Sequence, residues 1–293
     1  MPTGKIVKSL RELYYVQSGG SVFPCKGRGN FRKKKITPLV GDDVEFNIDE
    51  NEEGYILEIH KRKNEFVRPP IANIDQAIIV ASVVEPDFKP LLLDRFLVLI
   101  ESKSLQPVIV FTKTDLLDDD KKQEIEKYKQ AYEELGYQVV MGSSKIDHSL
   151  EEVSTFLEGK TSVIAGQSGV GKSSMLNALE PNLQLETNQI SKSLGRGKHT
   201  TRHVELIEMY GGLVADTPGF SALEFQGLEL DELPDCFPEM REFGEECKFR
   251  GCLHNKEPKC AVKQAVEDGD IPRFRYEDYL HFLHEIQNRK PRY

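Results

Sequence analysis

Five short β-like segments occupy the first part of the chain. Each has seven or eight residues and is rich in β-branched and aromatic side chains, with mostly Gly- or Asp-containing turns between them. They are residues 4–10, 13–19, 21–27, 42–49 and 53–60. Five strands in so short a stretch predict a small closed barrel, and the OB-fold is the expected topology. Pro69 and Pro70 should end this module, because proline cannot donate a hydrogen bond to a strand ladder.

From residue 74 the pattern changes to apolar runs that alternate with amphipathic segments. Residues 74–83 and 107–115 begin as nearly continuous apolar runs, which is typical of strands covered on both faces. Helical spacing follows in residues 91–102, 121–136, 149–158 and 173–179, and further strands are expected at 137–141 and 162–165. This alternation predicts a doubly wound α/β domain, whose ligand loops lie at the carboxyl ends of its strands.

The last part of the chain contains a helical apolar pattern. Its members, which should pack on the α/β domain or on the segment before them, are Tyr276, Tyr279, Leu280, Leu283 and Ile286. We therefore predict three domains, at residues 1–68, 69–221 and 222–293.

Composition describes an ordinary globular protein, with 39% hydrophobic and 30% charged residues. No stretch reaches the roughly 20 apolar residues that a membrane span requires, and the amino terminus lacks the apolar region of a secretory signal. The five cysteines are odd in number and three of them cluster late in the chain, which favours a metal site in a reducing cytoplasm over disulfides.

The net charge of −9 is unevenly distributed: residues 1–68 carry +3 and the remainder −12. No acidic residue lies between Glu12 and Asp42. This interval is either a solvated loop or a surface for the phosphate backbone of RNA. Its candidate RNA-binding residues are Lys26, Arg28, Arg32, Lys33, Lys34 and Lys35.

The strongest motif is a phosphate loop that follows an apolar strand and opens a helix. Its backbone N–H groups would surround the β-phosphate, Lys172 would bridge the β- and γ-phosphates as a catalytic group, and Ser173 would ligate Mg²⁺. A chance match is expected in roughly one chain of this length in a hundred. The nucleotide-binding candidates are Ala165, Gly166, Gln167, Ser168, Gly169, Val170, Gly171, Lys172, Ser173 and Ser174.

Two further loops fit the recognition of guanine. Thr112-Lys113-Thr114-Asp115 satisfies the pattern [NT]-K-x-D, in which the carboxylate accepts from guanine N1–H and from its amino group. Adenine offers neither donor. Position 112 holds Thr where most GTPases have Asn, so one amide contact is missing. Ser143-Ser144-Lys145 follows the next strand and fits the short loop that supports guanine O6 through its backbone.

Two segments are typical of nucleotide switches. Asp216-Thr217-Pro218-Gly219 fits D-x-x-G, with Asp216 holding Mg²⁺ and the Gly219 N–H near the γ-phosphate. In residues 195–202, either Thr200 or Thr201 would complete the Mg²⁺ shell, since neighbouring side chains of an extended segment point opposite ways. His199 is the candidate for orienting the attacking water, because Phe220 follows Gly219 where Ras-like enzymes have Gln.

The order of the motifs indicates a circular permutation. The guanine-reading loops precede the phosphate loop, and D-x-x-G comes last, whereas Ras-like chains begin with the phosphate loop. Chain ends often lie close together, so the same sheet can close either way.

Cys247, Cys252, His254 and Cys260 lie within 14 residues, a set that suits a closed tetrahedral zinc site. Buried thiols without a metal are the alternative. Cys25 and Cys236 lie outside the cluster.

The barrel, the permuted motifs GRGKHTTR and DTPGF, and the Cys/His cluster resemble the RsgA family, also called YjeQ or YloQ, over essentially the whole chain. The resemblance implies a monomeric, cytoplasmic GTPase that is stimulated by the 30S subunit, binds 16S rRNA and acts in late maturation of that subunit. It also implies inhibition by guanosine tetraphosphate. Two other functions fit the motifs: an RNA-binding assembly factor that uses GTP only as an occupancy signal, and an ATPase, which Asp115 argues against.

Overall fold

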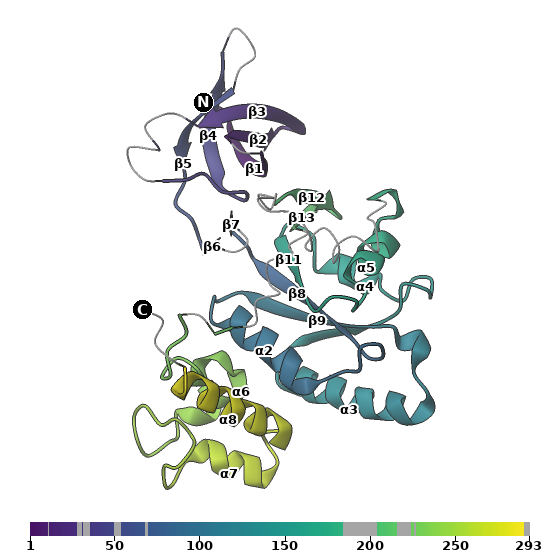
Figure 1. Ribbon diagram of the computed structural model, residues 1–293, viewed down its shortest axis with the longest axis vertical. Helices are drawn as coiled ribbons and strands as arrows, with labels where there is room; N and C mark the ends of the chain where they lie inside the picture. Colours follow the sequence, from purple (N-terminus) through teal and green to yellow (C-terminus); the bar gives the residue numbers. More distant parts are fainter. Residues whose placement is uncertain are drawn as a thin grey trace.

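The computed structural model describes residues 1–10, 12–27, 31, 36–49, 54–67, 70–183, 204–215, 224–225 and 227–289. A small barrel, a central α/β domain and a group of carboxy-terminal helices follow one another along the long axis (Figure 1). The barrel and the helices lie at opposite ends, so the central domain contacts both.

The amino-terminal barrel closes through five strands in the order β1-β2-β3-β5-β4. The strands are β1 (Thr3–Leu10), β2 (Leu13–Ser18), β3 (Ser21–Gly27), β4 (Asp43–Ile48) and β5 (Gly54–Ile59). All pairs are antiparallel except β3 with β5, which is parallel. Alternate side chains such as Ile6, Val16 and Phe46 fill its interior. The predicted barrel and OB-fold topology are confirmed, with each strand within two residues of its expected bounds.

A two-stranded ribbon connects the barrel to the central domain. It pairs β6 (Glu65–Val67) with β7 (Pro70–Ala72) in antiparallel register. The Pro69-Pro70 pair was expected to end the barrel module, and the strands of the barrel do end before it, with β5. Pro70 nevertheless begins β7 of the separate ribbon. Proline is tolerated at the first residue of a strand, which is the position of Pro70 in β7.

The central domain is built on a six-stranded sheet with the order β10-β9-β8-β11-β13-β12. Its strands are β8 (Gln76–Ser82), β9 (Gln106–Thr112), β10 (Gln138–Met141), β11 (Thr161–Ala165), β12 (Leu206–Met209) and β13 (Gly212–Ala215). Only β12 is antiparallel to its neighbour. The chain first builds outward from β8 to β10 and then returns to the other side of β8 with β11. The carboxyl ends of β9 and β11 therefore flank β8, where a doubly wound sheet binds its ligand.

Both faces of this sheet are covered, as the continuous apolar runs predicted. Ile79, Phe111 and Val163 join one apolar cluster with residues of α2 (Pro90–Glu101) and α3 (Asp119–Glu134). The residues that alternate with them, including Ile78, Val110 and Ile164, join α4 (Glu152–Thr155) and α5 (Lys172–Leu179). The α2–α3 pair and the α4–α5 pair lie on opposite faces in Figure 1. Short 3₁₀ helices occur at Thr114–Leu116, Pro181–Leu183 and Pro234–Cys236.

One predicted helix is much shorter than expected. Residues 149–158 form helix only over α4, a single turn. The hydroxyls of Ser154 and Thr155 donate to the carbonyls of Glu151 and Glu152, which competes with the helical ladder.

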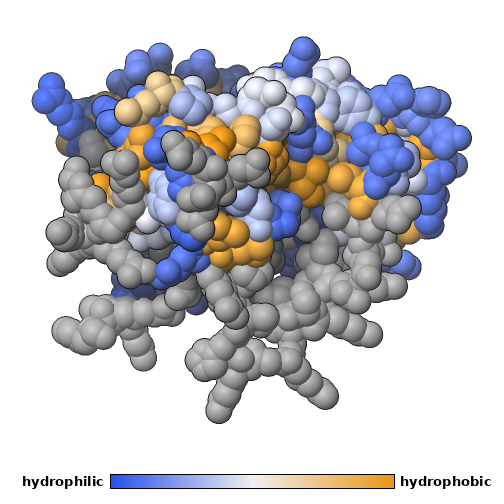
Figure 2. Space-filling view, turned by 90° about the horizontal axis from the view of Figure 1, so that it is seen from above, coloured by the Kyte–Doolittle hydropathy of each residue, from blue (hydrophilic) through white to orange (hydrophobic). Residues whose placement is uncertain are grey.

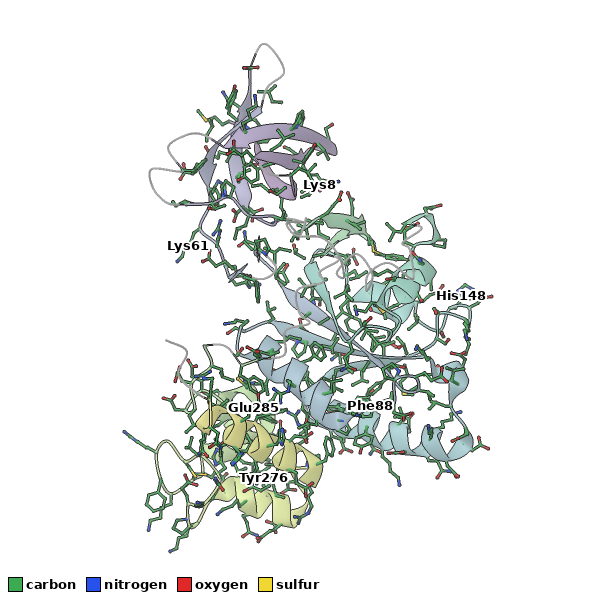
Figure 3. The ribbon with its side chains drawn as sticks, in the orientation of Figure 1. Lys8, Lys61, Phe88, His148, Tyr276 and Glu285 are labelled. Carbon is green, nitrogen blue, oxygen red and sulfur yellow. The ribbon has the colours of Figure 1, made fainter. Side chains whose placement is uncertain are left out.

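The carboxy-terminal helices have their own apolar core. They are α6 (Pro238–Gly244), α7 (Ala261–Asp268) and α8 (Arg273–Gln287). Tyr279, Leu283 and Ile286 of the predicted helical pattern are buried in this core, together with Val98 from α2. The packing of α8 against α2 includes a two-bond contact between Arg95 and Glu285, the latter labelled in Figure 3. The helix therefore packs on both elements that the sequence allowed.

A buried ionic cluster fixes these helices to the central domain. Arg275 of α8 contacts Asp94 of α2 at 2.6 Å and Glu239 of α6 at 2.7 Å, and all three side chains are at most 2% exposed. The Tyr132 hydroxyl donates to Asp94 at 2.7 Å. Burial, followed by the nearby Asp94 carboxylate, raises the pKa of Asp278 to about 8, so Asp278 is protonated at neutral pH.

Within the described residues, no helix is both long and apolar enough to span a membrane.

Candidate functional site

The phosphate loop lies between β11 and α5, as its motif predicts. All five residues of β11 are buried, and the chain turns sharply at Gly166, whose φ is 135°. A Cβ atom at this position would approach the Val80 carbonyl oxygen to 2.3 Å, so the close passage over β8 requires glycine. The Lys172 ammonium lies over the loop and donates to the carbonyls of Gly166 and Gln167 at 2.9 and 2.6 Å.

The two guanine-loop candidates meet at the ends of β9 and β10. The Ser143 hydroxyl donates to Asp115, and the Lys145 ammonium lies 3.4 Å from the other oxygen of the same carboxylate. The Ser143 hydroxyl, followed by Lys145, lowers the pKa of Asp115, so the carboxylate is ionised and can accept hydrogen bonds. Lys113 adopts a left-handed backbone conformation with φ 61°, and its ammonium donates to the Glu85 carbonyl.

One hollow is lined by both guanine loops and by the phosphate loop. Thr112, Lys113 and Asp115 line it from the first loop, Ser143 to Lys145 from the second, and Gly171 and Ser174 from the phosphate loop. The lining residues of different loops are 26 to 62 positions apart in the sequence, and the sheet brings these loops to one edge. Sequence reasoning missed four other lining residues, which carry no motif signal: Glu85, Leu116, Leu150 and Met175.

A direct hydrogen bond joins the first guanine-loop candidate to the phosphate loop. The Thr112 hydroxyl donates to the Val170 carbonyl at 2.6 Å, and the Ala81 carbonyl lies 3.3 Å away. Nothing in the local sequence predicts this contact between residues 58 positions apart.

Several predicted site residues lie outside the described residues. They are His199, Thr200, Thr201, Asp216 and Gly219 of the switch segments, and Arg28, Arg32, Lys33, Lys34 and Lys35 of the basic interval. Of that interval's predicted RNA-binding residues, Lys26 is described, at the end of β3. Viewed from the barrel end, the molecule shows apolar areas bordered by hydrophilic residues (Figure 2).

The barrel contacts the central domain at the β12–β13 ribbon. Lys8 of β1 forms an isolated antiparallel bridge with Glu205 and a 2.8 Å ion pair with its carboxylate (Lys8 is labelled in Figure 3). Gln17 of β2 donates to Glu208 at 2.9 Å. The β12–β13 ribbon begins just after the first predicted switch segment and ends just before Asp216. The barrel is therefore attached to the part of the chain between the two predicted switch segments.

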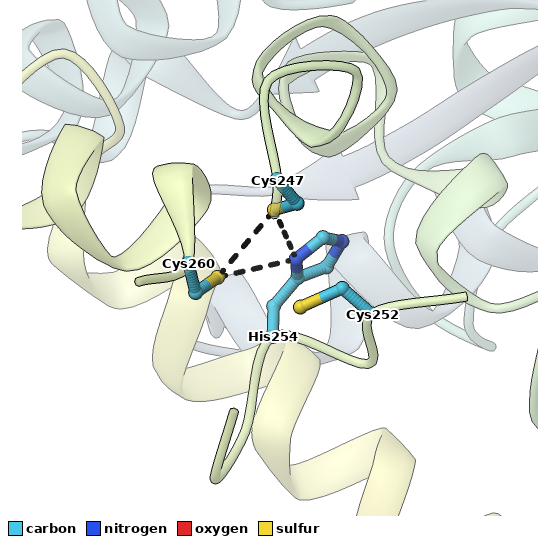
Figure 4. Close-up of side chains that lie close together, drawn as sticks. All are labelled: Cys247, Cys252, His254 and Cys260. Carbon is cyan, nitrogen blue, oxygen red and sulfur yellow. Dashed lines mark hydrogen bonds between the residues drawn. The ribbon is translucent and has the colours of Figure 1, made fainter. Parts of the chain in front are cut away.

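The predicted metal ligands converge in the carboxy-terminal module (Figure 4). The ligand atoms of Cys247, Cys252, His254 and Cys260 all lie within 4.8 Å of one another. Cys247 Sγ lies 3.8 Å from Cys260 Sγ, and His254 Nδ1 lies 3.6 Å from Cys247 Sγ and 3.4 Å from Cys260 Sγ. Disulfide sulfurs lie about 2.05 Å apart, whereas two thiolates on one tetrahedral ion lie about 3.8 Å apart, given metal–sulfur bonds of about 2.3 Å. The spacing therefore fits a shared metal ion.

The surroundings of the cluster hold its loop in place. The hydroxyls of Tyr276 and Tyr279 donate to the carbonyls of His254 and Leu253, both at 2.7 Å. Burial lowers the pKa of His254, which keeps its imidazole in the neutral form that binds metals. Burial also raises the pKa of Cys260 to about 12, so a bound cation is needed to stabilise its thiolate.

Comparisons with known proteins agree with these features. The sequence model described as RsgA GTPase matches residues 59–226, and the one described as RsgA N-terminal domain matches residues 3–56. A protein of Oceanobacillus iheyensis named "Small ribosomal subunit biogenesis GTPase RsgA 2" is 63% identical over 293 residues, and a Bacillus cereus protein named "Small ribosomal subunit biogenesis GTPase RsgA" is 59% identical over the same length. Each alignment covers 100% of both chains.

Two solved structures share the whole architecture. One, described as the crystal structure of YloQ, a circularly permuted GTPase, is 52% identical with a TM-score of 0.88, and the match covers 100% of this chain and 97% of that one. The other, YjeQ from Thermotoga maritima, is 38% identical with a TM-score of 0.88 and 99% coverage of both chains.

Proposed function

This chain belongs to the RsgA family of small ribosomal subunit biogenesis GTPases, and we propose that it hydrolyses GTP to GDP and phosphate while bound to the 30S subunit, late in the maturation of that subunit. The observation that carries the proposal is the single hollow lined by the phosphate loop and by both guanine loops. Asp115 would select guanine, and the backbone of residues 166–171 would hold the phosphates.

The catalytic roles extend this proposal. Lys172 would neutralise the β- and γ-phosphates, while Ser173, Asp216 and one of Thr200 and Thr201 would hold Mg²⁺. His199 orients the attacking water. When bound, Mg²⁺ would supply positive charge beside the phosphate oxygens, and these residues would position it.

Residues 1–68, 69–221 and 222–293 act as three units in this proposal. The barrel, through Lys26, Arg28, Arg32, Lys33, Lys34 and Lys35, contacts the phosphate backbone of 16S rRNA. Support for a link to catalysis comes from the Lys8–Glu205 pair, because it attaches the barrel to the ribbon between the two switch segments. The protein would act as a cytoplasmic monomer, with guanosine tetraphosphate as an inhibitor competing for the same hollow.

The decisive test is GTP hydrolysis titrated with purified 30S subunits. We expect saturable stimulation of turnover by about 10²-fold, in the range that a positioned base contributes. His199→Ala should lose most of the stimulation, whereas His281→Ala on the exposed face of α8 should keep it. If turnover stays basal while GTP still changes the affinity for 30S, the occupancy-signal function replaces this one.

We also propose that the Cys₃His cluster binds one structural Zn²⁺. Thiolate and imidazole ligands at tetrahedral spacing favour this ion. We expect about one zinc per chain by elemental analysis, and Cys260→Ser should lose it. Because the ion supplies folding energy, this variant should also be cleaved by protease about 10²-fold faster near residues 247–260. Cys236→Ser, a buried thiol outside the cluster, is the matched control and should retain the zinc. Full zinc content in Cys260→Ser would contradict the assignment.

A further inference from the structure

The hydroxyl of Thr112 faces two backbone carbonyls. Thr112 ends β9 and is 3% exposed. Its oxygen lies 2.6 Å from the Val170 carbonyl oxygen and 3.3 Å from that of Ala81. A hydroxyl has one proton and a carbonyl can only accept, so this proton is directed to the protein backbone, with Val170 the closer acceptor. No donor remains on this side chain for a ligand.

Guanine needs donors as well as acceptors for a complete reading. Its N1–H and amino group are donors, which suit the Asp115 carboxylate, whereas O6 and N7 only accept. An Asn at position 112 would offer two N–H donors, one for the Val170 carbonyl and one for the base. Thr has a single donor and can serve only the first of these.

Three neighbouring side chains that carry donors also have protein partners. The Lys113 ammonium donates to the Glu85 carbonyl, and the Ser143 hydroxyl donates to Asp115. The Lys145 ammonium lies 3.4 Å from the same carboxylate. The last two contacts direct the Ser143 hydroxyl and the Lys145 ammonium toward Asp115.

The same hydroxyl holds the two loops together. A Cβ atom added at Gly171 would lie 3.7 Å from the Thr112 oxygen, so the phosphate loop passes close to this side chain. The hydrogen bond to Val170 satisfies a carbonyl at the residue before Gly171 and thereby fixes the separation of the base and phosphate ends of the hollow.

We propose that Thr112 is a specificity-determining residue that ties the guanine-reading loop to the phosphate loop and leaves guanine N7 unread. The site would then accept guanine nucleotides whatever occupies ring position 7. This inference rests on the proposed function, since it presupposes that guanine occupies the hollow.

The test compares GDP with 7-deaza-GDP, in which N7 is replaced by C–H, by calorimetry on the full chain. Wild-type protein should bind the two with dissociation constants within about twofold. Thr112→Asn should bind 7-deaza-GDP about tenfold more weakly than GDP, the size of one net hydrogen bond. Thr112→Val should weaken the binding of both nucleotides about equally, because it removes the hydrogen bond to Val170 but no contact with the base. Thr112→Ser keeps the hydroxyl and should bind both nucleotides as the wild-type protein does.

The outcomes separate this proposal from the assignment of the site. If wild-type protein selects GDP over ADP yet binds 7-deaza-GDP at least tenfold more weakly, another group reads N7 and the proposal is overturned while the guanine site stands. Equal binding of both analogues by Thr112→Asn would also overturn it. If ADP binds as tightly as GDP, the guanine site itself fails, and the proposal fails with it.

Discussion

Asp115→Asn should lower the affinity for GDP by about 10²- to 10⁴-fold. The substitution removes the charge from a carboxylate that would accept two hydrogen bonds from guanine, each worth about 1.5–3 kcal/mol. The Ser143 hydroxyl lowers the pKa of Asp115 below its ordinary acidic value, so the carboxylate is charged at neutral pH and the variant loses a full charge. Calorimetry with GDP measures the effect.

A gain of affinity provides the control for this prediction. Xanthine has a carbonyl at position 2 where guanine has an amino group, so the Asn amide can donate to it while still accepting from N1–H. Asp115→Asn should therefore bind xanthosine diphosphate more tightly than wild-type protein does. Asp119→Asn makes the same charge change on the exposed first turn of α3 and should bind GDP normally. Unchanged GDP affinity in Asp115→Asn would refute the guanine assignment.

The sequence predicted the strands and loops whose conformation depends mainly on residues that are neighbours in the chain. In β8, apolar residues on both alternating faces indicated a strand covered on two sides, and Ala77, Ile78 and Ile79 are all fully buried. The motif residues Gly166 and Asp115 were assigned from short patterns, because loop geometry at a strand end depends on only a few neighbouring residues. Their order then predicted the permutation, which the likeness to YloQ confirms.

Contacts that depend on distant segments could not be predicted. Thr112 can donate to the Val170 carbonyl only because β9 and β11 lie on either side of β8. No local sequence pattern predicts this strand order. The burial of Arg275 could not be predicted either, because in the sequence Arg275 is one of several charged residues on an amphipathic helix. A lone arginine at helical spacing is usually solvated, and its burial depends on the carboxylates that α2 and α6 bring to it.

Arg275→Met should destabilise the protein by about 3–5 kcal/mol at neutral pH, because it leaves two buried carboxylates without a counter-charge. Asp94 and Glu239 are at most 2% exposed and lose contacts of 2.6 and 2.7 Å. The guanidinium also lies 4.5 Å from the ring centre of Phe237, and Met preserves part of this packing. Since α2 belongs to the central domain and α6 and α8 to the carboxy-terminal module, we expect hydrogen exchange to rise first along the α2–α8 contact.

The pH dependence distinguishes lost charge pairing from lost packing. Unpaired buried carboxylates have a raised pKa, so the folded variant takes up protons that the unfolded chain binds only in acid. The deficit in unfolding free energy should therefore be large at pH 7 and should shrink toward pH 4.5, where both states are increasingly protonated. Lys129→Met, which breaks the partly exposed 3.0 Å pair with Glu133, should cost at most about 1 kcal/mol. A packing loss removes the same contacts whatever the protonation state of the carboxylates. An equal deficit for Arg275→Met at both pH values would therefore mean that Arg275 stabilises the protein through packing around Phe237 and not through charge pairing.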